Sequence, residues 1–102
     1  MLIALLKGEI TQDEYMRANN INIFYKDMPG YIHGLVIKYR DISMIVINRY
    51  LSKAKANLTI LHEFAHLELH HLDNFICEYK RDDIEDEADR YVEFLLDTVK
   101  GC

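Results

Sequence analysis

The sequence lacks the features of membrane, secreted and multidomain proteins. Its longest apolar stretches, Leu2 to Leu6 and Met44 to Ile47, are far too short to cross a bilayer. The N-terminus has neither the charged start nor the small-residue cleavage site of a signal peptide. We find no internal repeat, linker or low-complexity tract. At 102 residues we therefore expect one soluble, cytoplasmic domain spanning residues 1–102, with no membrane contact.

Cysteine and clustered positive charge are also scarce. Cys77 and Cys102 share no C-x-x-C spacing, so free thiols in a reducing compartment are the expected state. The formal net charge is -5, and the lysines and arginines form no cluster. Because binding to a phosphate backbone needs clustered Lys and Arg, direct contact with nucleic acid is not expected.

The most informative stretch present is His62-Glu63-Phe64-Ala65-His66, an H-E-x-x-H pattern. Positions four apart lie on the same side of a helix, so both imidazoles can reach one metal ion. Glu63 can then hold the water bound to that ion. This spacing is typical of zinc peptidases, and the competing interpretation is a pair of hydrogen-bonded histidines in the core.

The helix that carries this pattern is predicted to be buried on most of its circumference. At about 100 degrees per residue, two apolar sides form. One side contains Leu58, Leu61, Ala65, Leu69 and Leu72. The other side contains Ile60, Phe64 and Leu67. The main polar interruption is a wedge of Thr59, His62, Glu63, His66 and His70. An ordinary surface helix places its charge on a solvent face, so a polar wedge on a core helix indicates a binding partner.

Helices and strands are both predicted in the remaining chain. Thr11 and Glu14 form a capping box, which predicts a helix from about Gln12 to Asn19. Strands are expected at residues 21–25, 34–39 and 43–48, the last two as an antiparallel hairpin. Residues 2–8 and 75–80 are ambiguous.

The two long helices have recognisable boundaries. The core helix should begin between Ser52, a plausible cap, and Asn57, and should run to about His71. A stripe at helical spacing predicts a final helix with Ile84, Ala88, Tyr91, Val92, Leu95, Leu96 and Val99 on its apolar side.

A catalytic zinc usually has three protein ligands and one water, so two histidines are not enough. His70 cannot be the third ligand, because three histidines along one straight helix spread too far to share an ion. The acidic opening of the final helix offers Glu85, Asp86, Glu87 and Asp89. By helical angle Asp86 points away from the apolar stripe and Asp89 lies past its edge, which leaves Glu85 and Glu87. Stabilisation of the helix dipole is the competing explanation for this cluster.

A wider pattern joins the H-E-x-x-H stretch to Leu67, Leu69 and His70, and then to Glu87-Ala88-Asp89, Tyr91, Phe94, Leu95 and Leu96. It resembles the ImmA/IrrE family of small zinc metallopeptidases, over roughly residues 21–96. The resemblance implies that His62, His66 and Glu87 are the metal ligands of a Zn²⁺ ion and that Glu63 is the catalytic glutamate. The chain departs from the family at Phe64, Ala65 and Asp89, where relatives often have a smaller aliphatic residue, glycine and asparagine.

The resemblance also implies a fold and an activity. We expect a small α+β, zincin-like domain, with a short antiparallel sheet packed on the buried H-E-x-x-H helix and a C-terminal helix that supplies Glu87. The expected function is a zinc-dependent endopeptidase that cleaves one protein partner, and a DNA-binding repressor of a phage or mobile element is the first expectation. Tyr91 or His70 would stabilise the oxyanion. The β-run ending at Asn48 would offer an edge to the substrate.

A non-enzymatic regulator that keeps the fold and acts by binding a partner is the alternative. The intact Glu63 favours the enzyme, because pure binding has no evident need for a base beside the metal. Metal-dependent RNA hydrolysis requires another histidine spacing and a basic groove, neither of which is present. The sequence leaves open the native metal, the oligomeric state and any need for an activating partner.

Overall fold

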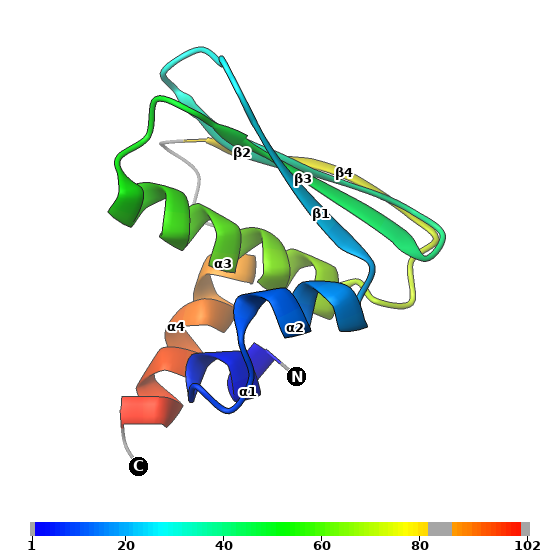
Figure 1. Ribbon diagram of the computed structural model, residues 1–102, viewed down its shortest axis with the longest axis vertical. Helices are drawn as coiled ribbons and strands as arrows, with labels where there is room; N and C mark the ends of the chain where they lie inside the picture. Colours follow the sequence, from blue (N-terminus) through cyan, green and yellow to red (C-terminus); the bar gives the residue numbers. More distant parts are fainter. Residues whose placement is uncertain (1, 82–86, 101–102) are drawn as a thin grey trace.

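A computed structural model describes residues 2–81 and 87–100, and of residues 79, 81, 87, 88 and 100 it describes the backbone alone. Within this part the elements follow the order α1 (Leu2–Leu6), α2 (Gln12–Ala18), β1 (Ile21–Lys26), β2 (Ile32–Tyr39), β3 (Ile42–Asn48), α3 (Lys53–Leu69), β4 (Phe75–Arg81) and α4 (Glu87–Lys100). All four helices lie on one side of the sheet (Figure 1). None of the described helices is long and apolar enough to cross a membrane.

The sheet is mixed, with the strand order β1-β3-β2-β4. β2 runs antiparallel to both β3 and β4, whereas β1 runs parallel to β3, with Ile23 opposite Ile45. The expectation of an antiparallel sheet is therefore wrong for β1. The reason is that β3 enters between β1 and β2, and a period-two pattern determines which face a side chain occupies without determining its neighbouring strand.

The predicted hairpin and the two predicted helix caps are confirmed. The β2–β3 hairpin turns at Arg40, whose φ of 56° lies in the left-handed region. Ser52 caps α3 by accepting a hydrogen bond from the Lys55 amide at 3.2 Å. The Thr11–Glu14 capping box is present at the start of α2. The two ambiguous segments become α1 and β4.

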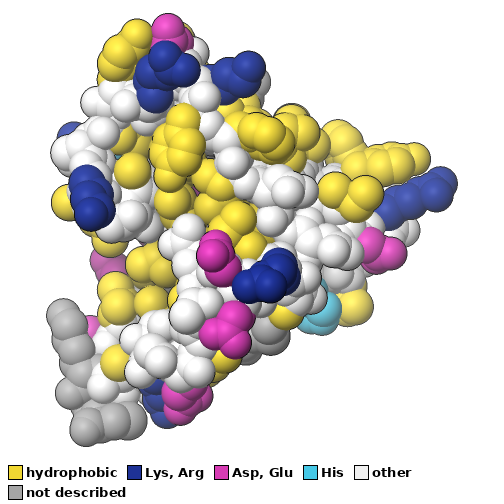
Figure 2. Space-filling view, in the orientation of Figure 1, with side chains coloured by type: hydrophobic (Ala, Val, Ile, Leu, Met, Phe, Trp, Pro, Cys, Tyr) yellow, Lys and Arg dark blue, Asp and Glu magenta, His cyan; other side chains and the backbone are white. Residues whose placement is uncertain are grey.

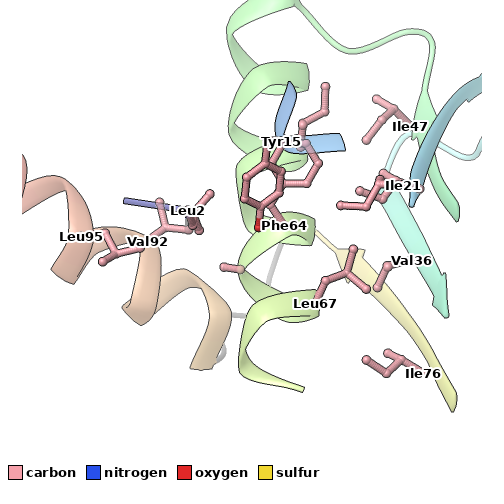
Figure 3. Close-up of a cluster of buried hydrophobic side chains, with 13 residues drawn as sticks. Leu2, Tyr15, Ile21, Val36, Ile47, Phe64, Leu67, Ile76, Val92 and Leu95 are labelled. Carbon is pink, nitrogen blue, oxygen red and sulfur yellow. The ribbon is translucent and has the colours of Figure 1, made fainter. Parts of the chain in front are cut away.

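α3 lies in the middle of the core, between the sheet and α4 (Figure 3). On its sheet side are Ile21, Val36, Ile47 and Ile76, and on its other side are Leu2, Val92 and Leu95. Phe64 is fully buried and its ring lies 4.7 Å from that of Tyr15, centroid to centroid. Two of the leucines expected on a buried side of this helix are not buried. Leu58 is 59% exposed, and Leu72, beyond the helix end, is 84% exposed.

A single carboxylate on α3 connects all four helices. Glu68 accepts a hydrogen bond from the backbone amide of Leu2 in α1 and one from the Tyr15 hydroxyl of α2 at 3.5 Å. Its second oxygen accepts the Tyr91 hydroxyl of α4 at 2.8 Å. These contacts fix α4 against α3, and α4 is the helix that completes the candidate site.

The outer face of the sheet, opposite the helices, has an apolar surface. The strand registers place on this face Phe24, Leu35, Ile37, Tyr39, Ile42, Met44, Val46 and Phe75. Five of these side chains are exposed, among them Phe24, Ile42 and Phe75. Figure 2 shows hydrophobic side chains along the upper right of the molecule, where Figure 1 places this side of the sheet.

Candidate active site

The three residues of the H-E-x-x-H pattern lie together in the buried middle of α3. The exposed fractions of His62, Glu63 and His66 are 2%, 0% and 7%. The two histidine rings are 5.4 Å apart, centroid to centroid. Glu63 Oε1 lies 3.4 Å from His62 Nε2. Both ring nitrogens of His66 and both carboxylate oxygens of Glu63 are shielded from solvent, so this part of the predicted polar wedge lies inside the protein.

The first histidine of the pattern is held from the side by α4. Asp89 Oδ1 lies 2.6 Å from His62 Nδ1, and Lys80 of β4 donates to Asp89 Oδ2 at 2.6 Å. Burial raises the pKa of Asp89, but the hydrogen bonds from Lys80 and His62 outweigh that effect and the pKa lies below its ordinary value. The charged carboxylate can only accept, so Nδ1 of His62 carries a proton and donates.

This hydrogen bond determines what the imidazole of His62 can do. When Nδ1 of a neutral histidine carries the proton, Nε2 has the lone pair. His62 Nε2 is buried in the wedge, on the side where Glu63 lies. A carboxylate that holds the far nitrogen of a histidine is the usual support of a metal-binding imidazole. The geometry therefore leaves Nε2 suited to bind a metal ion.

Helical angle alone did not reveal the partners of Asp89. It placed this residue past the edge of the apolar stripe, and the structure shows that the partners of Asp89 are His62 and Lys80. The angle was measured from the apolar core, but the neighbours of Asp89 are polar groups beside that core. Lys80 was missed because nothing in the sequence links position 80 to position 89.

His33 is a second residue that the sequence did not single out. The β2–β4 register shifts between Ile32 and Gly34, so His33 occupies a β-bulge. Bulges redirect a side chain, and they are over-represented beside active sites. His33 lines the same cavity as His62. The strand predicted from β-branched residues began at residue 34, so the prediction neither included His33 nor indicated a bulge.

The other predicted site residues have different outcomes. α4 begins at Glu87, two residues before Asp89, but the side chain of Glu87 and all of Glu85 and Asp86 lie outside the described residues. Where side chains are described, no three His, Cys, Asp or Glu residues are grouped closely enough to hold a metal ion. The third-ligand assignment therefore stays a prediction.

The two residues considered for the oxyanion have partners elsewhere. Tyr91 donates to Glu68, so its hydroxyl is directed away from the wedge. His70 follows the end of α3, where its ring stacks on that of His66 at 5.5 Å, and its Nδ1 lies 3.2 Å from Asp73. His70 therefore forms part of the wall beside His66.

A comparison with protein families gives the family. The model of the IrrE N-terminal-like domain, a peptidase family, matches residues 16–100. The chain belongs to the ImmA/IrrE family. The match begins within α2 and includes the whole sheet, α3 and α4. No curated protein and no solved structure matches the chain.

Family membership indicates that this ImmA/IrrE protein is a metallopeptidase with a protein substrate. Its described residues fit a metal ion, because two buried imidazoles lie one turn apart and a carboxylate holds one of them in the required tautomer. Imidazole nitrogens suit zinc, and also copper, iron and nickel, so this donor set does not select one metal.

Proposed function

We propose that this protein is a zinc-dependent endopeptidase that cleaves a bond within a specific protein partner. The observation that carries the proposal is the buried wedge of α3, in which Glu63 lies beside His62 and Asp89 holds His62 at Nδ1. A purely structural histidine pair does not need a buried carboxylate beside one of its members. The ligands proposed for Zn²⁺ are His62, His66 and Glu87.

Glu63 and Asp89 each have a proposed task. When bound, Zn²⁺ would supply an acidified water and polarise the substrate carbonyl. Glu63 accepts the proton of the attacking water and delivers it to the leaving amine. Asp89 keeps the proton of His62 on Nδ1. The burial of Glu63 excludes bulk water, which would otherwise compete for these hydrogen bonds.

The edge first expected to meet the substrate is already paired within the sheet. β3 ends at Asn48 but lies between β1 and β2, so the edge expected there is already paired. β4 pairs with β2 on one side, and it stands at the end of the strand order. It also carries Lys80, which contacts the site through Asp89. We therefore propose that an extended substrate segment adds to β4.

The identity of the substrate rests on the family resemblance. A DNA-binding repressor of a phage or mobile element is the substrate that we propose, and the protease would relieve repression by cleaving it. The protease has a formal net charge of -5 and no cluster of Lys and Arg in its sequence. This supports contact with the repressor protein and not with the DNA that the repressor binds.

Metal content tests the site directly. Elemental analysis of the purified protein should find about one zinc per chain, and His62→Ala and Glu87→Ala should lose it. Glu85→Ala is the matched control and should keep the metal. A protein that binds no metal after zinc is supplied would overturn the proposed site. Loss of zinc in Glu85→Ala, but not in Glu87→Ala, would assign the third ligand to Glu85.

Cleavage tests the mechanism. The zinc-loaded protein is incubated with a proteome-derived peptide library and with candidate repressors, and products are identified by mass spectrometry. Glu63→Gln should keep the metal and the fold but lose cleavage by at least about 100-fold, the scale of general-base catalysis. Glu9→Gln, on the exposed surface, is the control. Unchanged cleavage by Glu63→Gln would contradict the mechanism, and a metal-loaded wild type that cleaves nothing would favour the binding-module alternative.

A further inference from the structure

A cavity of about 350 Å³ lies between α3 and α4, next to the candidate site. His62, Asp89 and Lys80 line one part of it. The volume equals that of roughly ten water molecules in the liquid, which is more than a small side chain needs. It is therefore large enough for one leucine or phenylalanine side chain.

Apolar side chains from both helices form part of the wall of this cavity. Leu58 of α3 lies one turn before His62, so the two side chains are on the same side of the helix. Val92 and Leu96 of α4 are also four residues apart and form the opposite wall. Leu58 is 59% exposed and lies just before Thr59, where the buried part of α3 begins. This arrangement leaves apolar surface open beside a polar site.

The charged residues of the cavity do not make it a polar site. Lys80 and Asp89 are joined by a 2.6 Å ion pair, so each has its charge balanced by the other. Lys55 and Glu93 line the cavity too, and both side chains are exposed at its margin. The interior surface that a ligand would meet is therefore mainly apolar.

We propose that this cavity binds a large aliphatic or aromatic side chain of the substrate, from a residue that flanks the cleaved bond. The inference rests on the proposed peptidase function, because the flanking position is defined by the bond held at Glu63. A peptide placed with its carbonyl near His62 has its neighbouring side chain within reach of Leu58, one helical turn away. The cavity thus selects the substrate by the size and hydrophobicity of one residue.

Filling the cavity tests this specificity. Leu58→Trp adds bulk at a position that is exposed, so the fold should tolerate it. Cleavage efficiency at sites flanked by Leu, Ile, Met or Phe should fall at least about 10-fold, while sites flanked by Gly or Ala change by less than about 2-fold. The matched control is Leu72→Trp, an exposed leucine outside the cavity, which should cleave as the wild type does.

A binding measurement separates the cavity from the peptidase activity. Methyl NMR spectra of the Glu63→Gln variant are recorded with N-acetyl-leucine amide and with N-acetyl-glycine amide. The leucine probe should shift the methyl signals of Leu58, Val92 and Leu96, and the glycine probe should not.

The outcomes are distinguishable. Methyl shifts without any cleavage would overturn the peptidase proposal and support the apolar cavity. Cleavage with no preference at either flanking residue, or the absence of methyl shifts, would overturn the cavity proposal and leave the peptidase intact.

Discussion

Asp89 is the residue whose hydrogen bond prepares His62 for a metal. Asp89→Ala removes the acceptor of the Nδ1 proton, so the imidazole can change its tautomer and orientation. Supporting carboxylates of this kind are typically worth 10- to 100-fold in metal affinity, and we expect a loss of about that size. Competition with a chromophoric zinc chelator measures it. Asp97→Ala, exposed on the same helix, should leave the affinity unchanged, and equal losses in both variants would contradict the role of Asp89.

Gly34 permits the close packing of β2 on its neighbours. A Cβ at this position would lie 2.7 Å from the carbonyl oxygen of Val46 and 3.2 Å from Thr59 Cγ2 on α3. The backbone cannot give way cheaply, so Gly34→Ala should reduce the free energy of unfolding by about 1–3 kcal/mol. Urea unfolding tests this. Gly30→Ala, where a Cβ meets nothing within 4 Å, should change it by less than about 0.5 kcal/mol.

At this scale the sequence predicted the centre of the site but not its surroundings. The burial of His62, Glu63 and His66 follows from helical spacing, which is a local property. The Lys80–Asp89 pair joins two elements that the sequence places separately, and the choice between such partners is made by tertiary packing. Helical spacing therefore predicts on which side of the helix a residue lies, but it does not predict which residue of another element contacts it.

Among the elements, α4 depends on the contact between Tyr91 and Glu68. Burial, together with the hydrogen bond and the negative charge of Glu68, raises the pKa of Tyr91 to about 12, from an unfolded value near 10. The folded pKa is the higher one, so this stability is complete below about pH 10 and is lost as the pH rises toward 12. Burial and Glu68 also raise the pKa of Tyr15.

Alkaline unfolding checks this contribution. Chemical unfolding at about pH 9 and about pH 11 should show a smaller loss of stability in Tyr91→Phe than in the wild type. Tyr50→Phe, at an exposed tyrosine, should lose as much stability as the wild type. Identical pH dependence in the wild type and Tyr91→Phe would show that the Tyr91–Glu68 contact does not contribute.

Element boundaries were predictable where a local signal exists. Thr11 and Ser52 cap their helices through hydrogen bonds within one turn, so sequence alone reveals them. Residues 75–80 carried no such signal. Their strand exists because β2 offers a pairing edge, and a partner 40 residues away in sequence cannot be read from a short apolar run.

At the scale of the whole molecule, the strand order was the property least accessible to sequence. The hairpin of β2 and β3 was predictable because its turn is short. β1 pairs with β3 although β2 lies between them in the sequence, so no short turn indicates that pairing. The outer face of the sheet was equally hidden. The alternation of side chains along each strand showed that the sheet has two faces. It did not show that the helices cover only one of these faces.

This apolar outer face should govern solubility. Phe24→Lys places a charge on the exposed side of β1 without entering the core, and we expect a several-fold increase in the concentration at which light scattering rises. Phe94→Lys makes the same chemical change at an exposed position on α4 and should have a smaller effect. An equal effect of both substitutions would show that added charge, and not this face, controls association.

The contacts that Glu68 and His62 make with α4 can form only late in synthesis. The ribosome releases the sheet and α3 before α4, so the emerging chain contains His62 and His66 while Asp89 and Tyr91 are still missing. Only when α4 has been synthesised can Tyr91 engage Glu68 and Asp89 reach His62. A nascent chain would thus hold the proposed hydrolytic centre in an unfinished state until α4 has been synthesised.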